Sequence, residues 1–246
     1  MLALSSAFPQ TCKRIHSTIK SFSPFAHAYY ILGRHPLKPY KPYFSDEPLL
    51  NVSSLLSSAL RYPITNLAVL ETLYRIILRS NPNSKFSDAP AIELPKRLFR
   101  SLGESDATRD VNSDPLPMLR FLWEDHSTYF PKPMAGSHGE YPLVCAVHAE
   151  FIPLVKFLLD HGADPGWRDC LAVRVAIGKK DLKLVKMLIE LEKPDRWMRN
   201  RIVARGYLLD VAVKCNARDI VEYLMKEKKC VPQIRTLRSR RSEYSL

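Results

Sequence analysis

Four histidines and a cysteine fall close together, and side chains of these types can ligate a metal. They are His126, His138, Cys145, His148 and His161, all within 36 residues. His138, Cys145 and His148 are spaced seven and three residues apart. Structural zinc sites instead pair their ligands as Cys-x2–4-Cys or His-x3–5-His. We therefore predict no metal site.

Motifs of enzymes are also missing from the sequence. It contains no GxSxG, HExxH, P-loop or GxGxxG pattern, and its eight glycines leave little material for a phosphate-binding loop. The acidic residues are dispersed among basic ones, without an isolated carboxylate pair of the kind used in acid–base catalysis. We predict no catalytic residue and no cofactor. The alternative is a catalytic segment within residues 36–130.

Two long segments carry residues that are suited to contacting a protein partner. EKPDRWMRNRIVARGY (192–207) places arginines around a tryptophan, and HSTYFPKPMAGSHGEY (126–141) contains Tyr129, Phe130 and two prolines. Arginine and tryptophan anchor partners through planar hydrogen bonds and buried area. The predicted partner-binding residues are Arg196, Trp197, Arg199, Arg201, Tyr129 and Phe130. We expect an acidic or phosphorylated protein partner; alternatively, Trp197 packs against the protein's own helices and residues 126–141 are a spacer.

A seven-residue pattern recurs five times and indicates the elements that hold these segments. The copies are LYRIILR from Leu73, MLRFLWE from Met118, LVKFLLD from Leu154, LVKMLIE from Leu184 and IVEYLMK from Ile220, with starts 45, 36, 30 and 36 residues apart. An alanine recurs upstream of the last three copies, as Ala146, Ala176 and Ala212. A small residue lets one helix approach its neighbour closely. Each unit is predicted to be a short first helix, a turn and a second helix.

The segment YPLVCAVHAEFIPLVKFLLDHGADP (141–165) resembles the ankyrin repeat, with its first helix, its second helix and its HGADP turn. The resemblance is clear over about 141–232 and degenerate over 49–125. Tyr141 and Val144 replace the threonine and histidine of the family's TPLH motif. The resemblance implies an all-α, ankyrin-like helical-hairpin solenoid of about four to five repeats, with HEAT- or TPR-like hairpins as the structural alternative. It also implies a noncatalytic protein–protein interaction module or adaptor.

The net charge of +12 is concentrated at the two ends of the sequence. Residues 1–45 carry six Lys/Arg and no acid, giving +6, and residues 226–246 carry seven Lys/Arg and two acids, giving +5; the remaining residues therefore carry +1. Basic ends attract phosphate groups, so an organellar RNA- or ribosome-associated factor is the alternative function. Nucleic acid is therefore a second candidate partner.

The ends also define the predicted organisation. Residues 1–45 are predicted to be a basic leader and Pro-rich arm, residues 46–232 the repeat domain, and residues 233–246 a basic tail. Because residues 1–22 lack acid and place apolar and basic residues on different helical faces, they are predicted to be a mitochondrial presequence. A disordered basic arm, with a cytoplasmic or nuclear protein, is the alternative. The five scattered cysteines favour a reducing, intracellular compartment, and no apolar run is long enough for a transmembrane helix.

Overall fold

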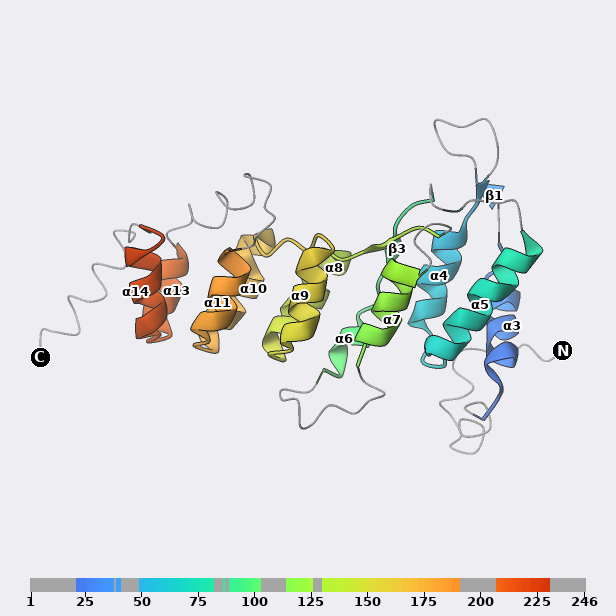
Figure 1. Cartoon of the computed structure of the whole chain (residues 1–246), viewed down its shortest axis with the longest axis horizontal. Coiled ribbons are helices and arrows are strands. Elements are labelled where there is room, and N and C mark those ends of the chain that lie inside the picture. Colours follow the sequence, from blue (N-terminus) through green and yellow to red (C-terminus); the bar gives the residue numbers. More distant parts are fainter. Residues whose placement is uncertain are drawn as a thin grey trace, which may run out of the picture. The chain divides into compact units, whose positions relative to one another are not determined.

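The computed structural model describes residues 21–37, 39–40, 49–81, 86, 89–102, 114–125, 130–190 and 207–230. Within these ranges it contains eleven α-helices and four strands of two residues each (Figure 1). The protein is thus mostly helical, as the repeat pattern predicted. Residues 1–20 of the predicted leader and the predicted tail 233–246 lie outside the described residues, so the mitochondrial assignment stays a prediction.

The chain forms two compact units, which we call unit 1 and unit 2. Unit 1 comprises Met1–Pro95 and Pro115–Met134, and unit 2 comprises Lys96–Asp114 and Ala135–Leu246. The described elements of unit 1 are α3 (Pro24–Arg34), β1 (Pro39–Tyr40), β2 (Leu49–Leu50), α4 (Val52–Arg61), α5 (Leu67–Ser80), β3 (Ile92–Glu93), α7 (Leu116–Arg120), the π-helix η3 (Phe121–Asp125) and β4 (Pro133–Met134).

Short polar side chains begin the helices of unit 1. The Asn51 side chain accepts a hydrogen bond from the Ser54 N–H at 2.9 Å, and Asn66 accepts one from the Val69 N–H at 3.0 Å. Each bond satisfies a donor that the first turn of a helix leaves without an internal partner. Strand β1 pairs antiparallel with β2, and β3 pairs parallel with β4.

Helix α3 was not predicted from the sequence, which suggested a leader and an extended arm in this region. Ser23 caps it by accepting from the Ala26 N–H at 3.3 Å, and Pro24 occupies the first turn, where its missing N–H is harmless. Ala28 and Ile31 are fully buried, and α3 packs against α5 (Figure 1). Burial of one apolar face against α5 therefore stabilises a helix that sequence periodicity alone did not reveal.

Unit 2 contains the clearest repeats. Its described helices are α6 (Arg97–Arg100), α8 (Ser137–His148), α9 (Ile152–Asp160), α10 (Trp167–Gly178), α11 (Leu182–Ile189), α13 (Tyr207–Lys214) and α14 (Arg218–Lys226). Helices α8 and α9, α10 and α11, and α13 and α14 pack as pairs, and α10 also contacts α8 and α13 (Figure 1). The helical pairs predicted around Leu154, Leu184 and Ile220 are thus confirmed. We call α8, α10 and α13 the first-helix row, and α9, α11 and α14 the second-helix row.

The same backbone hydrogen bond recurs in the turn inside each helical pair. The amide of Phe151 bonds to the carbonyl of Ala146 at 3.0 Å, Asp181 to Ala176 at 3.3 Å, and Ala217 to Ala212 at 3.0 Å. The residue before each of these donors has a left-handed backbone, with φ of 53° at Glu150, 58° at Lys180 and 51° at Asn216. This is the Schellman arrangement that ends a helix. The recurrent alanines therefore mark the end of each first helix.

Buried positions follow the same period. Ala146, Ala176 and Ala212 are each 0% exposed, which allows the first helices to pack closely. The second helices bury Leu158, Leu188 and Leu224 at equivalent positions, with at most 1% exposure. A fully buried leucine stabilises the fold by about 1.5–3 kcal/mol relative to an exposed one. The core of unit 2 thus lies between its two rows.

Candidate functional site

Most of the predicted partner-binding residues lie outside the described part of the chain. These are Arg196, Trp197, Arg199, Arg201 and Tyr129. Phe130 is described: it is 1% exposed, and its ring centroid lies 4.0 Å from that of Tyr74 and 5.5 Å from that of Phe86. Its ring belongs to the core of unit 1, so Phe130 is not exposed for contact with a partner.

The histidines considered as metal ligands have separate surroundings. His161 Nδ1 lies 2.7 Å from the Phe157 carbonyl oxygen, to which it donates, and its ring packs 4.1 Å from the Phe157 ring. His148 is exposed at the end of α8, and His126 lies outside the described residues. Among the described residues, no group of three or more His, Cys, Asp or Glu side chains is arranged to hold a metal ion.

The outward side chains of the first-helix row form a continuous strip, which we call the first-helix surface. Each first helix buries the positions that face its partner and leaves the others half-buried or exposed. The strip consists of Tyr141, Val144, Cys145 and His148 on α8, Leu171, Arg174 and Val175 on α10, and Asp210, Val211 and Lys214 on α13. Cys145, Val175 and Val211 occupy equivalent positions and make an apolar line along it.

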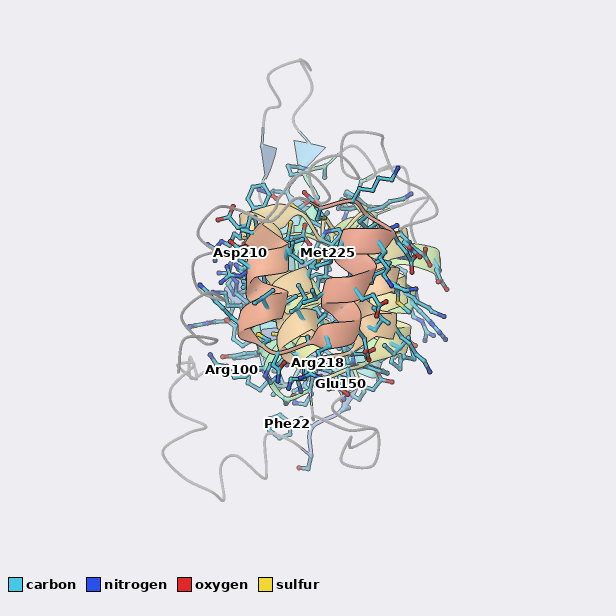
Figure 2. The ribbon with its side chains drawn as sticks, turned by 90° about the vertical axis from the view of Figure 1, so that its left-hand side faces the viewer. Phe22, Arg100, Glu150, Asp210, Arg218 and Met225 are labelled. Carbon is cyan, nitrogen blue, oxygen red and sulfur yellow. The ribbon has the colours of Figure 1, made fainter. Side chains whose placement is uncertain are left out.

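Helix α6 extends this surface with basic residues. It packs against α8, and Lys96, which precedes it, places its Nζ 5.4 Å from the centroid of the Tyr141 ring. Arg100 at its end is exposed and acts electrostatically on Tyr141. Figure 2, which looks onto α13 and α14, shows Arg100 and Asp210 on the α13 side. With Arg174 and Lys214, the extended surface carries four basic residues against one acid, Asp210.

Tyr141 and Cys145 interact within the surface, where burial raises the pKa of the Cys145 thiol. A hydrogen bond between the two side chains, and then burial, raise the pKa of Tyr141. Burial is also the main reason that the pKa of the Cys145 thiol is raised, and the Tyr141 bond opposes it. A cysteine nucleophile needs the opposite shift, because the thiolate is the reactive form. This pair therefore fits a binding surface better than a catalytic one.

The second-helix row carries a different kind of surface. Lys186 Nζ lies 3.2 Å from Glu227 Oε1, and Lys228 Nζ lies 2.8 Å from Glu190 Oε1. The Tyr223 hydroxyl donates to Glu190 at 3.0 Å, and hydrogen bonds from Lys228 and Tyr223 lower the pKa of Glu190. Positive and negative charges are thus paired with one another, and α11 is tied to the segment around α14.

The turns that enter α8 and α10 repeat one unusual conformation. His138, Gly139 and Glu140 have φ of 54°, 67° and 61°, and the three residues thirty positions later, 168–170, have φ of 45°, 58° and 54°. L-residues rarely adopt this left-handed region. The 30-residue spacing equals that of the helical copies at Leu154 and Leu184. The left-handed backbone therefore recurs with the same 30-residue period as the helices, although the residue types in these turns did not indicate it.

Glu140 is the unexpected residue of these turns. Its side chain is 7% exposed, and burial raises its pKa to about 7, opposed by a hydrogen bond from the Asp164 backbone. Its Oε2 atom has no hydrogen-bond partner within the described residues. Gly136 makes room for it, since a Cβ there would lie 2.5 Å from Glu140 Oε1. The equivalent position thirty residues on holds the buried, apolar Cys170, and aligning the two turns would have revealed this contrast.

Trp167 is the other residue that sequence reasoning missed. It is 48% exposed, and its indole Nε1 lies beside Gly139 in the preceding turn, where a Cβ would come within 3.0 Å of it. Arg168 and Asp169 next to it are also exposed. An exposed tryptophan next to charged residues is typical of a protein-contact residue. No role was predicted from the sequence for Trp167 or for the residues beside it.

Comparison with known protein families identifies one part of the chain. The family model of the ankyrin repeat matches residues 138–170, which include α8, α9 and the turn into α10. A search of the curated proteins and a search of the solved structures each gave no match. Within the described residues, no helix is long and apolar enough to cross a membrane.

Proposed function

We propose that this chain, whose residues 138–170 form an ankyrin repeat, is a noncatalytic protein-binding module that acts through the first-helix surface. The ankyrin repeat is typically a noncatalytic, protein-interaction module. The observation that carries the proposal is the contrast between the rows: two ion pairs, Lys186–Glu227 and Lys228–Glu190, link the segments of α11 and α14, whereas the first-helix surface combines an apolar line with an excess of basic residues.

The composition of this surface favours an extended or helical segment that carries acidic residues. Cys145, Val175 and Val211 offer apolar contact along its length, while Arg174, Arg100 and Lys96 offer positive charge at its edge. Apolar contacts contribute affinity, and complementary charge contributes specificity and association rate. Carboxylates or phosphates on the partner would bind the arginines in a bidentate geometry.

Site-specific photocrosslinking of the full-length chain tests this proposal. A crosslinker at Val144 or Val175 should capture a partner in the cells that express the protein, whereas one at Lys183 on α11 should capture far less. Arg174→Glu should lower the adduct yield at Val144 about tenfold, because like charges then face each other. Comparable adducts from both rows, or no effect of Arg174→Glu in a variant with an unchanged unfolding midpoint, would contradict the proposal.

The segment between α11 and α13 is proposed to add to the same partner contact through Arg196, Trp197, Arg199 and Arg201. The support is the residue types and the place of the segment in the sequence, between two repeats. Trp197→Ala combined with Arg199→Ala should weaken partner recovery, with Lys183→Ala as the matched surface control. Equal recovery from both variants would remove these residues from the site.

An RNA- or ribosome-associated role remains the second candidate, supported by the basic ends of the sequence. Several phosphate contacts would make RNA affinity fall steeply with salt concentration. A flat or absent response in a filter-binding titration of the full-length chain would exclude it. A mitochondrial location is proposed with it, and N-terminal sequencing of the endogenous protein tests that: a mature start near Ser17 means import, and an intact Met1 contradicts it.

A further inference from the structure

Helix α3 of unit 1 exposes an aromatic stripe that the proposed protein-binding function does not use. Phe22, Phe25 and Tyr29 are 46%, 56% and 52% exposed, although each is a large ring. Phe25 and Tyr29 are four residues apart, so they share one side of the helix, whereas Phe22 lies before the helix begins at Pro24 and its ring centroid is 6.2 Å from that of His27. The Phe25 and Tyr29 ring centroids are 4.6 Å apart, so the two rings form one patch. Phe22, labelled in Figure 2, is a third exposed ring just before the helix.

The opposite side of α3 is fixed by packing. His27, Ala28 and Ile31 are buried, and α3 contacts α5 along its length. The helix therefore does not need the aromatic stripe for its own folding. Two other exposed residues near the rings are small: Ala26 follows Phe25, and Gly33, four residues after Tyr29, has nothing within 4 Å of an added Cβ.

The stretch of sequence that contains this stripe is basic. Arg34 in the last turn of α3 is exposed, and residues 1–45 contain six Lys/Arg and no Asp or Glu. Among the described residues, the first acid in the chain is Glu71, which lies on α5, the helix that packs against α3. Exposed aromatic rings in a basic stretch of sequence favour a binding surface that has anionic groups above an apolar layer.

We propose that the aromatic stripe of α3 docks on the interface of an anionic lipid bilayer. Phenylalanine and tyrosine are favoured at the headgroup boundary, and basic residues add attraction to anionic headgroups. Rings that are about half exposed protrude from the surface, and fluid lipid can surround them without any preformed pocket. A protein partner would instead need a preformed pocket to bind the same rings. The helix lies on the bilayer and does not cross it, since eleven residues are too few to span it.

Vesicle co-sedimentation of the full-length chain tests the proposal. The chain should bind vesicles of phosphatidylcholine with phosphatidylserine, bind vesicles of phosphatidylcholine alone much less, and lose binding as salt is raised. The double variant Phe25→Ser/Tyr29→Ser should bind the anionic vesicles about tenfold or more weakly, because two rings no longer enter the interface. Both rings are exposed, so the unfolding midpoint of the variant should match that of the original chain.

Met225→Ser is the matched control, because Met225 is 49% exposed but lies on α14 of unit 2. It should leave vesicle binding unchanged. Equal binding by the double variant and the original chain would overturn the proposal, because charge alone would then explain the attachment. Absence of vesicle binding would also overturn it. So would a result in which Phe25 and Tyr29 are needed for self-association, measured by analytical ultracentrifugation, but not for vesicle binding.

Discussion

The two helical rows of unit 2 have the same period but present different surfaces. Along the second-helix row, Lys186, Lys228 and Tyr223 are paired with Glu227 and Glu190. Along the first-helix row, an apolar line is bordered by basic residues from α6, α10 and α13. The internal faces of both rows are equally buried and apolar. Because the repeats pack through their internal faces, the outer face of each row can carry different residue types without changing the packing.

The difference teaches where a mutation should affect stability and where it should affect binding. A change inside the second-helix row removes packing on both neighbouring helices. A change on the first-helix surface removes groups that are already half exposed, so its cost to folding is small. The following four variants test that division, from the largest expected effect to the smallest.

Leu188→Ala should destabilise the protein by about 2–5 kcal/mol, because Leu188 is 0% exposed and its removal leaves a cavity between the rows. Urea unfolding followed by far-UV circular dichroism measures the change. Val175→Ala on the first-helix surface is the comparison, and it should cost less than about 1 kcal/mol since Val175 is half-buried. Similar costs for the two variants would contradict the division between the rows.

Glu140→Gln should make the stability of the protein less dependent on pH. Burial raises the pKa of Glu140 from 4.5 to about 7, so the stability associated with its neutral form is complete below pH 4.5 and is lost as pH rises through 7. The neutral amide avoids that loss. At pH 8 the variant should be more stable than the original chain by about 1–3 kcal/mol, a range reduced for partial solvent screening.

Urea titrations of both chains at pH 5 and pH 8 measure this gain, and the two chains should differ little at pH 5. Cys170→Ser changes the equivalent turn without adding an ionisable carboxyl, so its effect should not change across this range. A gain from Glu140→Gln that is equal at both pH values would contradict the assignment of the pH dependence to Glu140.

Tyr223→Phe should cost about 1 kcal/mol, because it removes the hydroxyl that donates to Glu190 while keeping the buried ring. The variant tests whether the polar pairing of the second-helix row contributes to folding. Thermal unfolding measures the change, with Tyr29→Phe on the exposed side of α3 as the control that should have none. An unchanged midpoint for Tyr223→Phe would mean that the hydrogen bond from Tyr223 to Glu190 does not contribute to the stability of the fold.

Lys180→Gly should stabilise the protein by about 0.5 kcal/mol. Lys180 has φ of 58°, which costs a residue with a Cβ but not glycine; the greater freedom of glycine in the unfolded chain offsets part of the gain. Lys183→Gly is the control, because the same substitution inside α11 should instead destabilise by about 1 kcal/mol. The same sign of change for both would show that backbone strain in the turn is not the cause.

The periodic parts of this fold could be predicted from the sequence because the repeat constrains residue types. Buried leucines and alanines recur at fixed spacing, so the helices around Leu154, Leu184 and Ile220 and the turns after Ala146, Ala176 and Ala212 follow directly. The ankyrin resemblance over 138–170 was confirmed on the same residues. Surface residues carry no such constraint, so sequence reasoning turned to the conspicuous Arg and Trp of 192–207 and overlooked Trp167.

Two further features depended on tertiary contacts that no local pattern encodes. Helix α3 is stabilised by α5, and its exposed aromatic residues obscured its amphipathic character. Glu140 occupies a position where the sequence gives no sign of burial, because an acid before a first helix is ordinarily solvated. Its enclosure depends on Gly136, four residues earlier, and on the backbone at Asp164, 24 residues later, and only the first of these lies within a local sequence window.

The alanine of each turn lies eight residues before the start of its second-helix copy in all three pairs, at Ala146, Ala176 and Ala212. The copies themselves are 30 and then 36 residues apart, so the six additional residues fall between one pair and the next. Length can thus change at that junction without altering any helical pair. During evolution the junction is free to acquire binding residues such as those proposed at 196–201, and in the laboratory an epitope inserted there would perturb that partner contact without altering a helical pair.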